Sequence, residues 1–503
     1  MTNKTDLISR RKFLGTSAIA AAGITVLPSS VIAGLGHRAP SDKLNIAAVG
    51  IGGMGHSNIN AVKGSENIVA LCDVDWSYAE GTFSEHPRAK YYKDWRKMYD
   101  EMAKSIDAVI VATADHTHAI IAATGITLGK HVYVQKPLTH SVYESRLLTK
   151  LAAKYGVATQ MGNQGSSGNG VNKTCEWLAA GVIGDVTKVE AFTDRPIWPQ
   201  GLNTPENKET VPQTLDWDLF SGPAEVVPYN SIYHPWNWRG WWRYGTGALG
   251  DMACHILHPV FVGLDLGYPT KVQGSSSLLL NDCAPVSQFV SLTFPARQPK
   301  TVKGRTMKMK LPEVEVTWSD GGIKPLMPKG WPAGREPNDS GGYVCFHGTK
   351  DKLICGCYGV NPWLLSDPER KKEPKVPEFR RRITTSHEMD WVAACKEPVE
   401  SRRKLASSFD EAGPFNEMVV MGVLAVRLQS LNKILEWDGE NMQFTNLTDD
   451  ETIKICKKDG FSIHNGHPTF KKDWTDPIPA KQLAAELIKH TYRKGWTLPE
   501  MPA

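Results

Sequence analysis

The chain has 503 residues, of which 41% are hydrophobic and 22% are charged. This composition supplies enough apolar side chains for a large core and predicts a globular protein with two domains. The formal net charge of +5 is small for this length and scattered along the chain, which excludes an obvious nucleic-acid or membrane-surface footprint and favours small-molecule partners.

The first 33 residues have the pattern of an export signal. Ser9–Leu14 contains paired arginines, Gly15–Leu27 is apolar and rich in small residues, and Val31–Ala33 forms a small-residue cleavage site. The alternatives are an ordinary secretory signal or a membrane anchor, but the paired arginines favour the twin-arginine route and the apolar run is short for a bilayer. We therefore expect a periplasmic protein without a membrane anchor. Because the twin-arginine route carries folded proteins, it suits a protein that is exported with its cofactor already bound.

A short apolar strand, Leu44–Val49, is followed by a Gly-x-Gly-x-x-Gly motif and by a helical pattern over His56–Lys63. Such a loop lets backbone amides approach a pyrophosphate at a helix N-terminus. A second strand, Ile68–Leu71, leads to an acid placed to bind the adenosine ribose, which favours NAD over NADP. The expected cofactor contacts in this part of the chain are Gly50, Gly52, Gly53, Met54, Gly55 and Asp73.

The alternation of strands and helices continues from residue 107 to residue 161. Strands are predicted at Asp107–Ala112, His131–Val134 and Val157–Met161, with helices at His116–Leu128 and Val142–Lys154. This pattern predicts an α/β fold with a Rossmann-type, doubly wound parallel sheet, whose ligand crevice lies at the carboxyl ends of the strands. Three segments at such ends draw attention: residues 112–118, 135–137 and 162–164.

The residues in these segments resemble the glucose-fructose oxidoreductase, inositol dehydrogenase and rhizopine-catabolism family (Gfo/Idh/MocA), in particular its exported bacterial branch. The family has an Ala-Thr turn followed by a histidine and a Glu-Lys-Pro turn; this chain has Ala112-Thr113, His118 and Gln135-Lys136-Pro137. The resemblance implies that Lys136 lies near the nicotinamide and the substrate hydroxyl. It also implies cofactor contacts for Thr113, His118 and Gln135, although the acid of the family is replaced by an amide at residue 135.

A second family-like signature lies in Gly245–His255, where Asp251 and His255 are separated by four residues and would share one helical face. Such a pair is more often a surface pair or a packed histidine, but the upstream motifs favour a catalytic site. We expect His255 to act as the general base and Asp251 to orient it or bind the substrate. Lys136 would stabilise the developing alkoxide electrostatically or join the proton relay.

Other histidines raise the possibility of a metal site. His116 and His118 lie near a strand end, and His258 follows His255 on the same helical face. The nine cysteines lack the paired spacing of a structural zinc site. We expect no metal; His258 is interpreted as a further substrate ligand or as a structural residue, and the disulfide status is left open.

The loop Tyr229–Tyr244 is rich in aromatic residues and contains four of the sixteen tryptophans. Aromatic faces interleaved with polar groups suit sugar rings, but the same residues would equally brace a long loop from within. The candidate substrate residues are Asn163, Trp236, Trp238, Arg239 and His258.

The rest of the chain predicts an α+β domain. It contains strands at Thr270–Leu280, Phe289–Phe294 and Val314–Trp318 and late helices that begin near His387 and Pro414. The resemblance implies an open, mostly antiparallel sheet that covers the substrate side and mediates a homo-oligomer. The expected domain boundaries are residues 1–33 for the signal, 43–163 for NAD binding, 164–446 for substrate and oligomer contacts, and 447–503 for a packed C-terminal extension.

Together these features predict a periplasmic, NAD-dependent oxidoreductase that acts on a secondary hydroxyl of a sugar or glycoside, with the C3 hydroxyl suggested by the resemblance. One alternative is a redox-neutral, NAD-dependent glycosidase, in which transient oxidation enables elimination of the aglycone. Another is a non-catalytic glycan-binding protein with a structural NAD. Retention of Lys136, Asp251 and His255 together argues for an enzyme.

Overall fold

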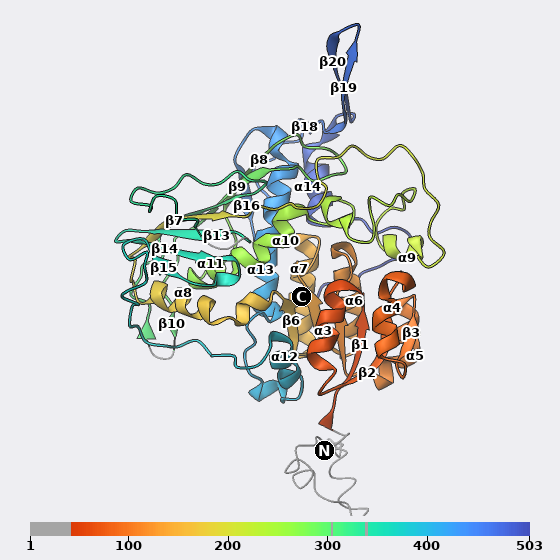
Figure 1. The fold of residues 1–503 in the computed structure, drawn as a ribbon, viewed down its shortest axis with the longest axis horizontal. Helices are drawn as coiled ribbons and strands as arrows, with labels where there is room; N and C mark the ends of the chain where they lie inside the picture. Colours follow the sequence, from red (N-terminus) through yellow and green to blue (C-terminus); the bar gives the residue numbers. More distant parts are fainter. Residues whose placement is uncertain (1–41, 303–304, 338–340) are drawn as a thin grey trace, which may run out of the picture. The chain divides into compact units, whose positions relative to one another are not determined.

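The structure is a computed structural model that describes residues 42–302, 305–337 and 341–503. The predicted export signal lies outside these residues. Residues 44–503 form one folded unit that contains two large sheets (Figure 1). In the described part of the chain, no helix is long and apolar enough to cross a membrane.

The first sheet has six parallel strands in the order of a doubly wound fold. Across the sheet the strands are β3 (Lys90–Tyr92), β2 (Asn67–Cys72), β1 (Asn45–Val49), β4 (Ala108–Val111), β5 (His131–Gln135) and β6 (Thr159–Gly162). The strands are almost continuously apolar, as expected for a parallel sheet that is covered on both faces. The predicted Rossmann-type sheet is confirmed.

Helices cover both faces of this sheet. They are α3 (Gly53–Val62), α4 (Trp76–Glu85), α5 (Trp95–Met102), α6 (Asp115–Thr127) and α7 (Val142–Tyr155). Alternate residues of β1 belong to different apolar clusters: Ala47 and Val49 pack with α5, α6 and α7, whereas Ile46 and Ala48 pack with α3 and α4. Elements α4, β3 and α5, which follow the predicted ribose-binding acid, were not predicted from the sequence.

The second sheet has nine strands and is mostly antiparallel, as predicted. In order the strands are β15 (Trp363–Leu364), β14 (Lys352–Gly356), β13 (Tyr343–Gly348), β7 (Val186–Phe192), β12 (Val314–Ser319), β9 (Gln288–Phe294), β8 (Lys271–Ser276), β16 (Leu435–Asp438) and β17 (Gln443–Phe444). Only β7 and β12 pair in parallel among the described strands of this sheet.

Helix α13 (Phe409–Arg427) connects the two sheets, since it contacts β8 and β9 of the second sheet and α7 and β6 of the first. Its Asn416 accepts a hydrogen bond from the amide of Leu138, at 3.0 Å, and so fixes the turn that follows Lys136. The predicted start near Pro414 is wrong: the helix begins five residues earlier, after Ser408, and continues through the proline. The remaining α-helices are α8 (Asn169–Ala179), α9 (Trp217–Ser221), α10 (Gly247–Ile256), α11 (His258–Gly263), α12 (His387–Cys395) and α14 (Ala480–Ile488).

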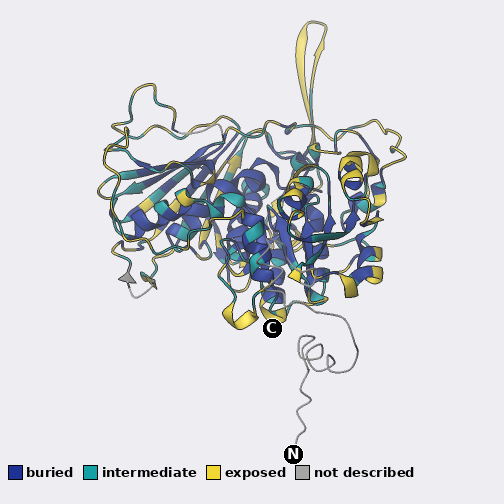
Figure 2. Ribbon diagram, turned by 60° about the horizontal axis from the view of Figure 1, so that its bottom comes forward, coloured by how far each residue is buried: buried dark blue, intermediate teal, exposed yellow. Residues whose placement is uncertain are grey.

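Strands β19 (Cys456–His464) and β20 (His467–Trp474) form a two-stranded ribbon that stands out from the rest of the unit and is exposed along nearly its whole length (Figures 1 and 2). Phe461 pairs with Phe470, and Ile463 pairs with Pro468, so these side chains share one face of the ribbon. Isolated two-stranded ribbons are marginally stable in water. The apolar face would gain stability from a partner surface, but the predicted homo-oligomer stays a prediction.

Candidate active site

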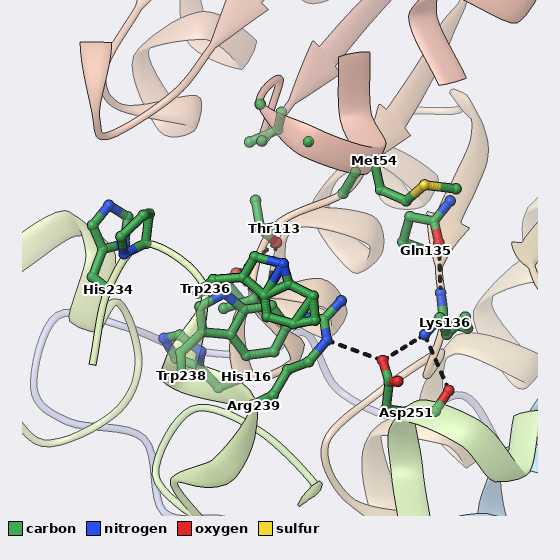
Figure 3. A pocket seen from close by; sticks show the side chains of 18 of the residues that line it. Met54, Thr113, His116, Gln135, Lys136, His234, Trp236, Trp238, Arg239 and Asp251 are labelled. Carbon is green, nitrogen blue, oxygen red and sulfur yellow. Dashed lines mark hydrogen bonds and ion pairs between the residues drawn. The ribbon is translucent and has the colours of Figure 1, made fainter. Parts of the chain in front are cut away.

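A cavity of about 710 Å³ lies at the carboxyl ends of the parallel strands. One wall comes from the loops that follow β1, β2, β4 and β5, and the opposite wall comes from α10 and from residues 195–239 (Figure 3). Its size is in the range of small-molecule sites, and its place is that of ligand crevices in doubly wound sheets. Most of the predicted site residues reach this cavity.

The loop between β1 and α3 has room only for glycine at two positions. A Cβ on Gly55 would lie 1.9 Å from the carbonyl oxygen of Gly50, and a Cβ on Gly50, whose φ is +74°, would lie 2.6 Å from that of Ala112. Helix α3 begins without a side-chain cap, so its first amides remain available to an anion. The cavity wall includes Gly50, Gly52, Gly53 and Met54, while Gly55 supports the loop from beneath. This loop fits a pyrophosphate.

Asp73 follows β2 and also lines the cavity. One carboxylate oxygen accepts a hydrogen bond from the amide of Ile51 at 2.8 Å, and the other accepts from the amide of Asp75 at 3.0 Å. Burial raises the pKa of Asp73 above its ordinary value, while the two amides oppose this shift. Each oxygen keeps acceptor capacity for a ribose hydroxyl. The glycine loop and Asp73 therefore fit a dinucleotide.

Asp251 on α10 is the meeting point of two cations. Its Oδ1 lies 2.6 Å from the Nζ of Lys136 and 3.0 Å from the Nε of Arg239, and Lys136 also donates to the Asp251 carbonyl at 3.0 Å (Figure 3). Burial alone would raise the pKa of Asp251, but Lys136 and Arg239 together hold it well below its usual range. The structure thus brings Lys136, a predicted catalytic residue, and Arg239, a predicted substrate residue, into direct contact with Asp251.

His255 lies one turn beyond Asp251 and is buried in the cavity wall. Its Nδ1 has no hydrogen-bond partner among the described residues, and its ring centroid lies 4.5 Å from that of Tyr358. Burial, followed by the charge of Lys136, lowers the pKa of His255 well below its ordinary value, although Asp251 opposes the shift. His255 is therefore a neutral imidazole in the cavity wall, which is the form that can accept a proton.

The aromatic residues of the loop Tyr229–Tyr244 fall into two groups: some line the cavity and others brace the loop from within. Trp236, which is 45% exposed, and Trp238 line the cavity, and the Arg239 guanidinium lies 4.5 Å and 4.3 Å from their ring centroids (Figure 3). Tyr233 and Trp241, by contrast, are buried in an aromatic cluster that braces the loop. The first group can contact a ligand, and the second group holds the first in place.

Besides Gly55, three other predicted site residues do not reach the cavity wall. His118 bridges two loops, with ring nitrogens 3.0 Å from the carbonyl oxygen of Thr113 and 2.8 Å from that of Pro137. Asn163 is fully buried and donates weakly to the Cys254 carbonyl at 3.4 Å. His258 is buried with its Nε2 3.2 Å from Glu411. These contacts position neighbouring backbone and helices; Thr113, Gln135 and Lys136 do line the cavity.

Sequence reasoning missed several residues that line the cavity: Tyr78, Arg195, Trp198, His234 and Tyr358. Tyr358 adopts a positive φ of 63° in the 3-10 turn Cys357–Gly359, and Gly165 leaves room for it, since a Cβ there would lie 2.6 Å from the Cβ of Tyr358. The Nε2 of His234 lies 3.0 Å from Asp75 and ties the aromatic loop to the first domain. His234 lies in the aromatic loop that the sequence pointed to, although it was not among the candidate site residues, and no local sequence pattern marks the others.

In the described ranges, no group of three or more His, Cys, Asp or Glu side chains is arranged to hold a metal ion. All nine cysteines fall within these ranges and are buried. His116, which lines the cavity, is held by the carbonyl oxygens of Phe220 and Tyr244, and burial lowers its pKa to about 4. The structure thus places His116, His118 and His258 in hydrogen bonds with the protein itself.

Gln135 is held by a chain of hydrogen bonds that ends on a buried acid. Its Nε2 donates to the Oδ1 of Asn58 at 2.8 Å, and the Nδ2 of Asn58 donates to Glu388 of α12 at 3.0 Å. Because a carboxylate only accepts hydrogen bonds, Glu388 fixes the orientation of both amides. A glutamate at residue 135 would place a carboxylate oxygen against the Oδ1 of Asn58. If the Asn58 amide flipped to avoid this, its Oδ1 would face the carboxylate of Glu388 instead. With an acid at residue 388, the chain of hydrogen bonds therefore requires a donor, such as an amide, at residue 135.

Gln135→Glu is expected to lower the free energy of unfolding by roughly 1–3 kcal/mol, because a buried acceptor loses its donor. Glu388→Gln in the same chain should restore most of the loss, since Asn58 can then donate to the new carboxylate at residue 135 and accept from the new amide at residue 388. Urea unfolding of the two single variants and the double variant measures the coupling, which we expect to exceed about 1 kcal/mol. If the two losses in the free energy of unfolding simply add in the double variant, the chain of hydrogen bonds from Gln135 to Glu388 is contradicted.

Two family models match the chain. Residues 44–163 match the NAD-binding Rossmann fold of the Gfo/Idh/MocA oxidoreductase family, and residues 175–297 match the C-terminal alpha/beta domain of the same family. The cofactor prediction is confirmed at this level, since the first model is described as NAD-binding. Together the two models cover elements from both sheets.

Individual relatives match a smaller part of the chain than the two family models do. Inositol 2-dehydrogenase of Salmonella typhimurium is 27% identical over 118 residues, which are 22% of this chain and 34% of the relative. A glycosyl hydrolase family 109 protein of Solibacter usitatus is 30% identical over 157 residues, which are 28% of this chain and 35% of that protein. The chain thus spans about a third of the length of the curated relatives it matches.

A solved structure is similar in fold over a larger part of the chain. The inositol dehydrogenase homolog of Azotobacter vinelandii, complexed with NADH and myo-inositol, has a TM-score of 0.52 to this chain at 16% identity, covering 78% of this chain and 98% of that one. At this identity the match shows the fold. The two family models, the two sheets and the glycine loop at their junction lead to the same assignment, and the chain belongs to the Gfo/Idh/MocA oxidoreductase family.

Proposed function

We propose that this protein is an NAD-dependent oxidoreductase that acts on a secondary hydroxyl of a sugar or glycoside. The observation that carries the proposal is the meeting of Lys136, Asp251 and His255 in one cavity beside a loop that fits a dinucleotide. Relatives named for inositol 2-dehydrogenase and levoglucosan dehydrogenase activity support a polyhydroxylated substrate.

The residues of the cavity have different roles in alcohol oxidation. His255, a neutral imidazole in the cavity wall, is the base that takes the hydroxyl proton. Lys136, held by Asp251, stabilises the negative charge that develops on the substrate oxygen. Bound NAD supplies the hydride acceptor. Trp236 and Trp238 offer apolar faces to a sugar ring, and Arg239 offers hydrogen-bond donors to its hydroxyls.

The finer proposal is oxidation at the C3 hydroxyl of a glycoside by a cofactor that stays bound and is recycled by a second substrate. Its support is the predicted twin-arginine signal, because a periplasmic enzyme would have no free pool of NAD to draw on. The periplasmic location belongs to the same proposal.

A second candidate is a redox-neutral, NAD-dependent glycosidase. The specific observation in its favour is the similarity to glycosyl hydrolase family 109 proteins, at 30% and 27% identity over 157 and 175 residues. The same base and the same bound cofactor would serve, because transient oxidation acidifies a neighbouring C–H bond and enables loss of the aglycone. Net sugar release without net reduction of the cofactor would separate this candidate from the first.

The test uses the full chain, recovered folded from the periplasmic fraction and without added cofactor. Absorbance near the reduced-nicotinamide band is followed while a panel of glycosides is added. A rise that depends on one glycoside supports the oxidoreductase and identifies its substrate. Aglycone release without a net rise supports the glycosidase. Glycan binding with neither signal, in protein that contains the cofactor, would contradict both and leave a binding protein.

A further inference from the structure

A partition made of two short segments separates the active-site cavity from a second pocket of about 710 Å³. The first segment is the 3-10 turn Gln164–Ser167, in which Gln164 lines the cavity and Ser166 lines the second pocket. The second segment is the junction of α10 and α11, in which His255 lines the cavity and Phe261 lines the second pocket. The partition therefore stands directly behind the base of the proposed reaction.

Four buried polar atoms in and beside this partition have no hydrogen-bond partner among the described residues. They are the Nδ1 of His255, the Nδ1 of His258, the Oδ1 of Asn163 and the Oγ of Ser166. Asn163 donates through its Nδ2 to the Cys254 carbonyl at 3.4 Å, and the amide of Ser166 donates to the Asn163 carbonyl at 2.9 Å. The lowered pKa of His255, caused chiefly by burial, includes a smaller effect of His258, three residues away. Buried polar atoms of this kind are ordinarily satisfied by protein or by ordered water.

The outer nitrogens of the two histidines determine which of the buried atoms donate. The Nε2 of His258 lies 3.2 Å from the Oε1 of Glu411, and although burial alone would raise the pKa of Glu411, this hydrogen bond helps to hold it below its ordinary value. Because a carboxylate only accepts, Nε2 of His258 carries the hydrogen and its Nδ1 is an acceptor. In His255 the Nδ1 is buried, so Nε2 is the base on the cavity side and Nδ1 carries the hydrogen. The partition thus holds a buried donor on His255 and a buried acceptor on His258.

Ordered water matches the four atoms in number and in kind. A water molecule can accept a hydrogen bond from the Nδ1 of His255 and donate one to the Nδ1 of His258. Its second hydrogen suits the amide oxygen of Asn163, and the hydroxyl of Ser166 can donate to its second lone pair. Water in this place would connect the base of the active site to His258.

The far end of this chain of groups is open to solvent. Glu411, the partner of His258, lines the second pocket. Its Oε2 lies 3.7 Å from the Nζ of Lys404, whose side chain is 72% exposed. Glu411 therefore joins the buried partition to bulk water.

We propose that ordered water in the partition carries the proton taken by His255 to His258, to Glu411 and so to the second pocket. The proposal rests on the proposed oxidation, in which each oxidised hydroxyl gives a hydride to the cofactor and a proton to the Nε2 of His255. The Nδ1 of His255 then gives its proton to the water, and the water gives one to the Nδ1 of His258. The Nε2 of His258 passes its proton to Glu411, which releases it to solvent. Both His258 and Glu411 act through His255 as positioning residues.

The first test follows a single turnover of the full chain, with its bound cofactor, on a glycoside that it oxidises. Reduced-nicotinamide absorbance reports the hydride, and a pH-indicator dye in weakly buffered solution reports the released proton. In the unmodified chain the two signals should rise together. In Glu411→Gln, which keeps an oxygen for His258 but cannot take up a proton, the dye signal should lag by about tenfold or more. Glu411→Asp restores a carboxylate and should shorten the lag.

The matched control is Glu417→Gln, which changes another buried acid of α13. Glu417 pairs with Arg146 and lines neither pocket. Its two signals should stay together. Signals that rise together in Glu411→Gln, on a glycoside that the protein does oxidise, would overturn the route and leave the cavity mouth as the exit. Failure of every glycoside to reduce the cofactor in the unmodified chain would instead contradict the proposed function.

A second measurement needs neither a substrate nor a variant that folds. A crystal structure of the full chain, at a resolution that shows ordered water, should place water at roughly 2.7–3.2 Å from the Nδ1 of His255 and, directly or through a second water, from the Nδ1 of His258. A partition without such water, or one in which protein atoms satisfy both nitrogens, would overturn the proposal.

Discussion

Replacing Lys136 with methionine is expected to lower kcat by about a thousandfold or more, the range seen when a preorganised electrostatic group or a proton-relay group is removed from an active site. Methionine keeps the length and the apolar stem of lysine but not its charge. Asp251 would keep Arg239 as its partner at 3.0 Å, so the fold should survive. Steady-state turnover with the identified substrate, together with cofactor content, measures the effect.

The matched control is Lys136→Arg, which keeps a cation beside Asp251 but changes its shape and reach. It should retain the fold and the bound cofactor and recover part of the turnover. Turnover of Lys136→Met within about tenfold of the unmodified chain would show that Lys136 is not part of the chemical step.

Acid unfolding gives Lys136→Met a second readout. The pKa of Asp251 is held well below its usual range in the folded state, against the effect of burial, by Lys136 and Arg239. Its contribution to stability is therefore present above the unfolded-state pKa and is lost only as pH falls through the folded-state pKa. Without Lys136 the folded-state pKa rises, so the variant should unfold at a higher pH than the unmodified chain.

The parts of the site that could be predicted are those set by local sequence. The glycine loop follows a buried strand and opens a helix, and each step of that pattern has a local signature that the structure reproduces. Asp251 and His255 were predicted from helical spacing together with the resemblance to a known family, and α10 places both in the cavity wall. Lys136 and Asp251 are 115 residues apart, and only the resemblance to a known family joined them before the structure did.

The residues that could not be predicted reach the site through tertiary contacts. Glu388 meets Asn58 across 330 residues, and His234 meets Asp75 across 159. Residues 193–246 contain little regular structure, so no periodic pattern separates the exposed Trp236 from the buried Trp241. Pro414 lies inside α13, although a proline normally stands at the first turn of a helix or outside it.

Exchange of His255 for asparagine is the second change with a large expected effect. Asparagine keeps a polar side chain but cannot take a proton, so kcat should fall by about 100- to 10,000-fold while cofactor content and ligand affinity stay close to those of the unmodified chain. His255→Gln is a second polar control and should show the same loss. Ligand affinity that falls in step with kcat would indicate that His255 binds the substrate rather than the proton.

The pH dependence of the unmodified chain follows from the environment of His255. Burial and the charge of Lys136 keep its pKa well below the ordinary value, so the imidazole stays neutral, and kcat should not fall as pH drops through about 6.5. Stability should respond differently. Below about pH 6.5 the unfolded chain binds a proton at this histidine and the folded chain does not, so stability falls with pH by up to about 1.4 kcal/mol per unit. His255→Asn removes this one contribution and makes the slope shallower, while the buried His116, His118 and His140, whose pKa values are also lowered, keep theirs. Urea unfolding of both chains across this range measures the difference; equal slopes would mean that His255 takes up the proton in the folded protein.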